Sequence, residues 1–257
     1  DVGRVGTKEG CAEGDCGACT VVVLSRSDGA TKLDVQAVNA CIQFLPTLDG
    51  KELLTVESLR APDGQLHPIQ QAMVDCHASQ CGFCTPGFVM SLFALYKNSR
   101  GASHQTIADT LSGNLCRCTG YRPIVEAATK MYAPKSDAPT TDTHGAHSSS
   151  DWLTRFGSTD TGATDKLVRL TNLRRSSSLA VENPSGRFYS PRALGELAQL
   201  YFEKPQALLL AGGTDVGLWV TKLAKDLPSI IYLGEVAELR AIRVDANHLE
   251  LGAGVTL

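Results

Sequence analysis

GCAEGDCGAC, residues 10–19, places three of the chain's nine cysteines in one glycine-rich loop. The other six stand at positions 41, 76, 81, 84, 116 and 118 of the 257-residue chain. Nine cysteines are too few for a disulfide scaffold of this length. Clustered cysteines in a chain without a visible export signal indicate metal ligands instead. Two sets of four with one left over therefore predict two metal centres.

The first set has the spacing C-x4-C-x2-C over Cys11, Cys16 and Cys19, and Cys41 follows further along the chain. This is the plant-type spacing for a [2Fe–2S] cluster. Three thiolates from one loop must wrap the cluster, and the glycines at 10, 14 and 17 give the backbone the freedom to do so. A zinc site is the alternative, although zinc ligands usually come as two separate knuckles.

The second set joins Cys81 and Cys84 to Cys116 and Cys118. Helical periodicity and capping signals predict four short helices around it, which open at Pro68, at Thr85 as N-cap before Pro86, at Ser103 and at Pro123. A four-helix bundle would bring the two cysteine pairs together beside helix N-termini, which favour anionic thiolates. On spacing alone, zinc and iron–sulfur are equally compatible with this set. Cys76 is left over, and we expect a buried packing thiol there.

A glycine turn follows a predicted buried strand at residues 207–211. Backbone N–H groups of Gly212 and Gly213 could converge there on a diphosphate, and Thr214 could add a hydroxyl. The motif alone is weak, because the G-x-G-x-x-G dinucleotide fingerprint is absent. Gly252 and Gly254 are interpreted as a second close backbone approach in the same domain.

The charge balance excludes one class of partner. The chain has 24 Lys and Arg against 27 Asp and Glu, a formal net charge of −3, so we expect no nucleic-acid partner. No apolar run approaches the ~20 residues of a membrane span, and no signal peptide is visible. We therefore expect a cytoplasmic protein without membrane partners. The abrupt first and last residues indicate a fragment.

The patterns predict an α+β fold in four stretches. Strands at 20–24 and 33–38 belong to a small domain over residues 1–56, and the predicted bundle occupies residues 57–132. Residues 133–183 are interpreted as a linker, because residues 133–150 contain no Leu, Ile, Val or Phe. The last domain, residues 184–257, has a predicted helix at 191–201 and strands at 207–211, 230–233, 239–244 and 249–251.

Four motifs resemble the xanthine oxidase family of molybdenum hydroxylases. GTKEGCAEGDCGACTV, SQCGFCTPGF and GNLCRCTGYRPI are similar to the family's two iron–sulfur domains, and AGGTDVGLWVTK is similar to its FAD domain. Within the family, the small iron–sulfur and FAD subunit of bacterial xanthine dehydrogenases is most similar. The resemblance implies a truncated β-grasp, plant-type ferredoxin domain over 1–56, a helical [2Fe–2S]-binding domain over 57–132, and the start of an FAD-binding domain over 184–257.

The resemblance also implies the site residues. The ligands of two [2Fe–2S] clusters would be Cys11, Cys16, Cys19 and Cys41, then Cys81, Cys84, Cys116 and Cys118. Gln80 and Cys118 would contact the molybdopterin. The residues implied for FAD are Leu209, Leu210, Ala211, Gly212, Gly213, Thr214, Asp215 and Val216.

The implied function is electron transfer. A molybdopterin-binding large subunit would oxidise xanthine or hypoxanthine to urate, and electrons would pass through the second cluster, the first cluster and FAD to NAD. We predict no catalytic residue in this chain. His144 and His147 are expected to be solvated in the linker, and the other histidines to lie at the surface or at helix caps. The alternatives are an aldehyde or N-heterocycle hydroxylase, a stand-alone ferredoxin-type carrier, and a non-enzymatic binding module held together by zinc.

Overall fold

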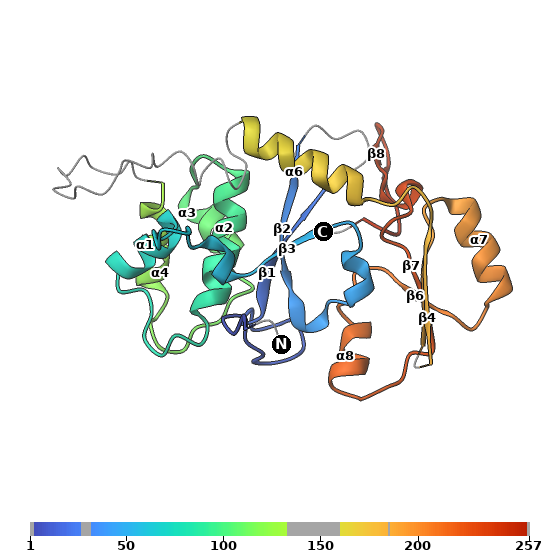
Figure 1. Ribbon diagram of the computed structural model, residues 1–257, viewed down its shortest axis with the longest axis horizontal. Coiled ribbons are helices and arrows are strands. Elements are labelled where there is room, and N and C mark those ends of the chain that lie inside the picture. The colour runs from blue at the N-terminus through green and yellow to red at the C-terminus, as the bar shows by residue number, and fades with distance from the viewer. Residues whose placement is uncertain (1–2, 27–31, 133–159, 185, 256–257) are drawn as a thin grey trace. The chain divides into compact units, whose positions relative to one another are not determined.

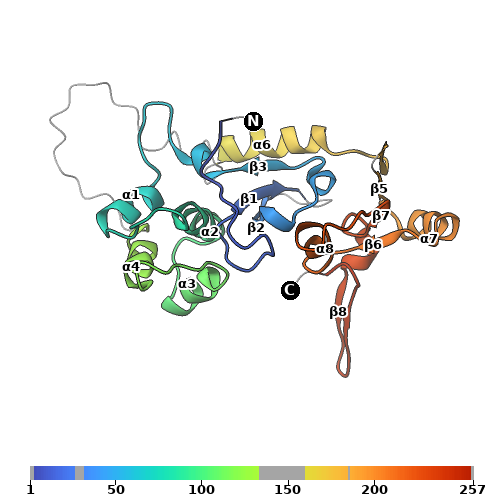
Figure 2. The same ribbon diagram turned by 90° about the horizontal axis from the view of Figure 1, so that it is seen from below.

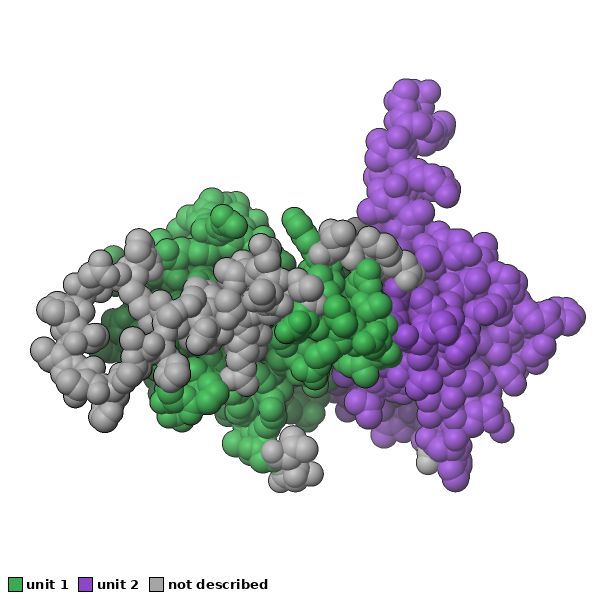
Figure 3. All heavy atoms as spheres, turned by 45° about the horizontal axis from the view of Figure 1, so that its top comes forward, with its two compact units in different colours: residues 1–40, 50–173 green, residues 41–49, 174–257 purple. Residues whose placement is uncertain are grey.

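The computed structural model describes residues 3–26, 32–132, 160–184 and 186–255. The chain forms two compact units (Figure 3). Unit 1 contains residues 1–40 and 50–173, and unit 2 contains residues 41–49 and 174–257. The predicted boundary at residue 56 therefore lies within unit 1. A short segment that follows the first cysteine loop, residues 41–49, belongs to unit 2.

The sheet of unit 1 has three antiparallel strands in the order β2-β1-β3. Strand β1 (Thr20–Ser25) is central and pairs with β2 (Asp34–Asn39) and β3 (Glu52–Leu54). Four β-branched or leucine side chains in succession, VVVL, make β1 almost wholly buried. The two strands predicted in this region are confirmed, and an α+β fold with them.

The predicted four-helix bundle is also present in unit 1. Its helices are α1 (Pro68–Asp75), α2 (Thr85–Asn98), α3 (His104–Leu111) and α4 (Arg122–Lys130). Helix α2 is buried from residue 87 to residue 95, because it lies between the other helices and the sheet (Figure 1). Bundle and sheet consequently share one hydrophobic core. Cys84, and not Thr85, occupies the N-cap of α2.

Part of the predicted linker has regular structure. Residues 133–159 lie outside the described residues, whereas α6 (Asp160–Leu173) is a helix that lies along β3 (Figures 1 and 2). Leu170 is buried in the core of unit 1, and Lys166 pairs with Glu52 of β3 at 2.6 Å. These contacts with the sheet explain a helix that the weak apolar periodicity of the segment does not predict.

Unit 2 is built on a four-stranded sheet in the order β4-β5-β7-β6. Its strands are β4 (Leu179–Asn183), β5 (Gly186–Ser190), β7 (Ser229–Tyr232) and β6 (Leu208–Leu210), and its helices are α7 (Leu194–Glu203) and α8 (Val216–Thr221). A hairpin of β8 (Ile242–Val244) and β9 (Leu249–Leu251) projects from this unit (Figure 2). The strand predicted over 239–244 is wrong in its first part, because a 3-10 helix, η4 (Ala237–Arg240), occupies it.

Three further 3-10 helices lie in the first sixty residues: η1 (Ala40–Ile42), η2 (Leu45–Leu48) and η3 (Val56–Leu59). Phe44, between η1 and η2, packs into the core of unit 2 with Phe188 and Leu210. None of the described helices combines the length and the apolar character that crossing a membrane requires.

Candidate functional site

The first cysteine loop folds around its own sulfurs. The backbone N–H groups of Asp15 and Cys16 donate to Cys11 Sγ at 3.4 and 3.3 Å, and the N–H of Cys11 donates to Cys16 Sγ at 3.4 Å. Residues Ala12, Gly14 and Gly17 have positive φ, the left-handed conformation that lets a short loop turn back on itself. The loop therefore directs N–H dipoles at sulfur, as a bound anionic thiolate cluster requires.

These N–H groups change the acidity of the first thiol. Burial would raise the pKa of Cys11, but hydrogen bonds from the backbone of Cys16, Glu13 and Asp15 lower it to about 7. The thiolate form that binds iron is accordingly accessible near neutral pH.

In the chain, Cys19 comes just before strand β1 and Cys41 comes just after strand β2, with which β1 pairs. Cys19 is buried and immediately precedes β1, and its carbonyl accepts from the N–H of Ala40 at 3.3 Å. Cys41 follows Ala40 in η1 and is the first residue of unit 2. The structure thus gathers Cys11 and Cys16, anchors Cys19 at the end of the loop, and assigns Cys41 to the other unit.

The second set forms two thiol pairs at one end of the bundle. Cys118 Sγ lies 3.6 Å from Cys81 Sγ, and the side chains of Cys84 and Cys116 are hydrogen-bonded to each other. Two thiolates on one tetrahedral metal ion with bonds of about 2.3 Å lie about 3.8 Å apart, so the Cys81–Cys118 separation suits a shared ion. The pairing also matches a two-iron cluster, in which each iron takes two thiolates.

A single zinc ion fits these pairs less well. Among the described residues, no three His, Cys, Asp or Glu side chains gather closely enough to hold one metal ion. A mononuclear zinc site needs four ligands around one point.

Within each pair, the hydrogen bond between the two sulfurs shifts the pKa values of both thiols in opposite directions. Burial, and then the hydrogen bond to Cys116, raises the pKa of Cys84 to about 12. Burial would also raise the pKa of Cys116, but hydrogen bonds from Thr119, from the N–H of Cys118 and from the Cys84 thiol lower it overall. In the other pair, the hydrogen bond between the sulfurs raises the pKa of Cys118, whereas the N–H of Phe83, followed by that sulfur contact, lowers the pKa of Cys81. A metal ion bound by each pair would take the place of the hydrogen bond between its two sulfurs.

A strained tyrosine supports the Cys116 loop. Tyr121, the N-cap of α4, has φ +68°, a rare conformation for a bulky residue. Its hydroxyl accepts from the N–H of Cys116 at 2.9 Å, and its ring packs edge-on against Phe88. The hydroxyl of Thr119 lies 3.1 Å from Cys116 Sγ. Sequence reasoning did not single out Thr119 or Tyr121; their position directly after C-R-C was the available signal.

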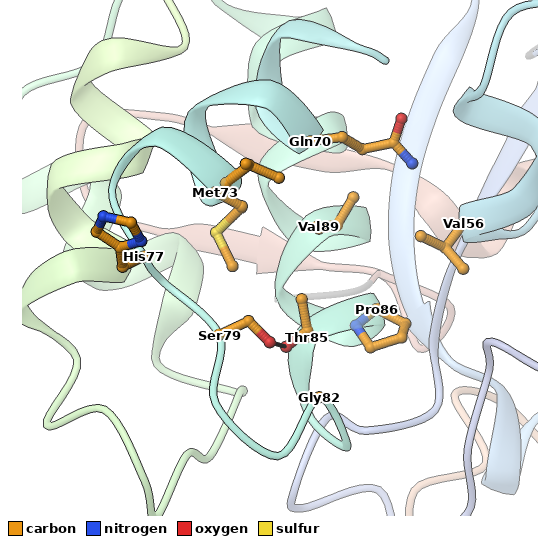
Figure 4. A pocket seen from close by; sticks show the side chains of 10 residues that line it. Val56, Gln70, Met73, His77, Ser79, Gly82, Thr85, Pro86 and Val89 are labelled. Atoms are coloured by element: carbon orange, nitrogen blue, oxygen red, sulfur yellow. Dashed lines mark hydrogen bonds between the residues drawn. The ribbon is translucent and has the colours of Figure 1, made fainter. Parts of the chain in front are cut away.

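The surroundings of the second site are open and partly apolar. Gln80, Cys81 and Cys118 are exposed, and apolar side chains are exposed around them at Phe83, Leu115 and Tyr121. On the neighbouring face, a groove of about 480 Å³ runs between α1 and the start of α2, with Met73 and Val89 on its wall (Figure 4). Ser79 and Thr85, whose hydroxyls lie 2.7 Å apart, also line this groove.

The left-over cysteine has the expected role. Cys76 is buried in the shared core of unit 1, which confirms the prediction of a packing thiol. His67 is a helix cap, as expected of the histidines, since its Nδ1 accepts from the N–H of Ile69 at 3.1 Å, but it is fully buried and not at the surface. His144 and His147 lie outside the described residues.

The predicted flavin loop connects β6 to α8 in unit 2. Gly213 has φ +82°, which lets the chain turn sharply after the strand, and its carbonyl accepts from the N–H of Gly217 at 2.8 Å. Residues 211, 212, 214 and 215 are exposed, whereas Leu210 is buried in the core. A side chain at Gly217 would have its Cβ 2.8 Å from Ile42 Cβ, so segment 41–49 packs directly beneath this turn.

The glycines at 252 and 254 have a different environment. Their N–H groups donate to the carbonyls of Ala241 and Leu239 at 3.0 and 2.8 Å. A Cβ on Gly252 would lie 2.1 Å from the Leu239 carbonyl oxygen. The contact that the structure shows at these glycines is with the η4 segment of the same unit, and a second backbone approach beside the flavin loop stays a prediction.

Two regions of the chain match known protein families. A family of [2Fe-2S] binding domains matches residues 55–129, and a family described as the FAD binding domain in molybdopterin dehydrogenase matches residues 181–257. The chain is 36% identical over its whole length to xanthine dehydrogenase 2 of Arabidopsis thaliana and covers 22% of that protein. It is 34% identical over 98% of its length to aldehyde oxidase 3 of Mus musculus, of which it covers 20%.

Among solved structures, quinoline 2-oxidoreductase from Pseudomonas putida 86 is 36% identical, with a TM-score of 0.43. The match covers 50% of this chain and 72% of that one. The chain spans about a fifth of the length of the curated relatives it matches.

Proposed function

Since the chain belongs to the xanthine oxidase family of molybdenum hydroxylases, we propose that it forms the electron-transfer part of such an enzyme. When bound, two [2Fe–2S] clusters supply one-electron carriers and FAD supplies a carrier that exchanges one or two electrons. The observation that carries the proposal is the arrangement of four thiols as two pairs at one end of the bundle.

The residues of the chain hold and tune these groups. The pairs Cys81–Cys118 and Cys84–Cys116 each take one iron of the second cluster. Cys11, Cys16, Cys19 and Cys41 hold the first cluster, whose sulfurs receive the N–H groups that already point at Cys11 and Cys16. The turn at residues 209–216 binds the FAD diphosphate. Domain boundaries at residues 56, 132 and 183 belong to the same proposal.

A molybdopterin-binding partner, on a separate chain or further along this one, covers the second site. Exposed apolar side chains that surround a functional group favour an interface, and Phe83, Leu115 and Tyr121 provide them around Cys81 and Cys118. Gln80 is exposed beside Cys81, where it can contact the pterin. The partner brings the hydroxylation chemistry, for which this chain supplies no catalytic residue.

For the complete enzyme we propose a cytoplasmic xanthine dehydrogenase that oxidises xanthine and hypoxanthine and reduces NAD. The similarity to xanthine dehydrogenases favours this substrate class. An aldehyde substrate is the second candidate, because an aldehyde oxidase is similar to nearly the same extent.

The test of the cofactor assignment starts from the full-length enzyme, purified without oxygen. We expect four irons per copy of this chain and two distinct [2Fe–2S] signals in low-temperature EPR after dithionite reduction. Cys118→Ser should abolish one signal, whereas Cys76→Ser, in the packing thiol, should leave both. Zinc in place of iron, with no EPR signal, would contradict the proposal.

A second measurement separates the substrate classes. Xanthine, an aromatic aldehyde and quinoline are each added to the oxidised enzyme. Reduction of the clusters is followed by the bleaching of their visible absorbance, in the presence of NAD or oxygen. Rapid bleaching by xanthine, with reoxidation by NAD, supports the xanthine dehydrogenase assignment. Bleaching by the aldehyde alone would replace it with the second candidate.

A further inference from the structure

Asn114 is a buried polar node between the two cysteine loops. Its side chain is 3% exposed. Its Nδ2 donates to the carbonyl of Gly17 at 3.1 Å and to Thr20 Oγ1 at 3.2 Å, and its Oδ1 accepts from Ser91 Oγ at 2.6 Å. One amide therefore joins the first cysteine loop, the start of β1 and helix α2, and it stands two residues before Cys116.

The backbone around this node leaves no room for side chains. A Cβ on Gly17 would lie 2.3 Å from the Gly113 carbonyl oxygen, and a Cβ on Gly87 would lie 2.1 Å from the Gly17 carbonyl oxygen. Both distances are far below van der Waals contact. The first cysteine loop, α2 and the segment before Cys116 are consequently in direct backbone contact, and glycine is what permits it.

This contact creates a short bonded connection between the two sites. The N–H of Leu115, the residue before Cys116, donates to the carbonyl of Cys16 at 2.9 Å. One hydrogen bond thus joins Cys16, a proposed ligand of the first cluster, to Leu115, the neighbour of Cys116, which is a proposed ligand of the second cluster. The length of this hydrogen bond depends on how firmly the first cysteine loop is held against the segment before Cys116.

We propose that Asn114 is a positioning residue that sets the separation of the two cysteine sites and, through the Leu115–Cys16 hydrogen bond, the electronic coupling between their clusters. The inference rests on the proposed function. An asparagine suits the position because it donates and accepts at once: its Nδ2 donates to the Gly17 carbonyl, which also accepts from the N–H and the hydroxyl of Thr20, and its Oδ1 accepts from the Ser91 hydroxyl. An aspartate would accept only, and its charge would be buried against a carbonyl oxygen.

The geometric part is tested without regard to the bound metal. Amide hydrogen exchange at Leu115 is measured in the full-length protein, in Asn114→Ala and in Asn98→Ala. The control removes another asparagine that links elements of unit 1, since Asn98 Nδ2 donates to the Val35 carbonyl at 2.9 Å, but it lies away from the cysteines. We expect faster exchange at Leu115 in Asn114→Ala alone. Unchanged protection in that variant would overturn the inference.

The electronic part uses the iron-loaded enzyme. With four irons and both EPR signals retained, Asn114→Ala should lose the spin–spin splitting between the two reduced clusters and slow the redistribution of electrons after partial reduction. Asn98→Ala should keep both wild-type properties. If Asn114→Ala does not load iron, Ser91→Ala, which removes only the bond to Oδ1, is expected to weaken the splitting. Wild-type splitting in every iron-loaded variant would overturn the inference, whereas zinc in the wild type would instead contradict the proposed function.

Discussion

Substitution of Gly87 by alanine tests the packing between the first cysteine loop and the bundle. Gly87 is the third residue of α2, where alanine is usually favourable by up to about 1 kcal/mol because glycine is a poor helix former. In this helix the new methyl group would lie 2.1 Å from the Gly17 carbonyl oxygen and 3.3 Å from Asn114 Nδ2. The substitution therefore has two opposing effects: a gain in helix propensity and a steric clash with the first cysteine loop.

The clash should dominate. The contacted atom belongs to the backbone and cannot rotate away, so the loop must move, and overpacking of this kind costs about 1–3 kcal/mol. The movement also lengthens the hydrogen bond from Asn114 to Gly17, worth about 0.5–1.5 kcal/mol. After the helix gain is subtracted, we expect Gly87→Ala to lower the free energy of unfolding by about 0.5–3.5 kcal/mol.

Urea unfolding of the full chain, followed by far-UV circular dichroism, measures this difference. The matched control is Gly195→Ala near the start of α7, where a Cβ would meet no atom within 4 Å. That variant should be as stable as the wild type or more so. The reasoning is refuted if Gly87→Ala is also as stable as the wild type, since the close approach of α2 and the loop would then not exist.

Three further predictions concern buried and strained side chains. Burial, followed by the charge of Lys97, holds the pKa of His67 at about 3, against about 6.5 when unfolded. As the pH falls, the unfolded chain therefore takes up the proton before the folded chain does. The free energy of unfolding should fall by about 2 kcal/mol from pH 7 to pH 5, and His67→Asn should lose this pH dependence. His77 has φ +51° at the end of α1, and thermal unfolding should show His77→Gly about 1 kcal/mol more stable. Phe44→Ala should destabilise unit 2 by about 1–3 kcal/mol in urea, but Leu45→Ala, at a 78% exposed side chain, by less than about 0.5 kcal/mol.

The sequence was most informative where chemistry and local structure coincide. The strand TVVVL and the prolines at helix starts predicted β1 and the bundle, because β-branched runs and N-terminal prolines act within a few residues. The spacing of the second cysteine set, combined with the helix ends, predicted that those thiols lie together at one end of the bundle. The structure then supplied which sulfur pairs with which.

Features that depend on contacts distant in sequence were not predicted. Helix α6 lies within the segment interpreted as a linker, beyond its polar part at residues 133–150, and its packing comes from Leu170 and the ion pair to Glu52. The end of α1 carries His77 where glycine is the usual signal. Asn114 lies in a motif that was recognised for its cysteines, and its role requires Gly17, Thr20 and Ser91, which the sequence separates by many residues.

The assignment of residues 41–49 to unit 2 changes how the flavin region must be understood. Phe44 packs with Phe188 and Leu210, and Ile42 occupies the space that a side chain at Gly217 would need. The turn after β6 is therefore supported by residues more than 150 positions earlier in the chain. A flavin domain that begins at residue 184 would lack part of its own core, so its folding depends on the segment that begins with Cys41. Because Cys41 adjoins Ile42, any movement of the turn on binding a diphosphate would act on a residue covalently bonded to a proposed iron ligand.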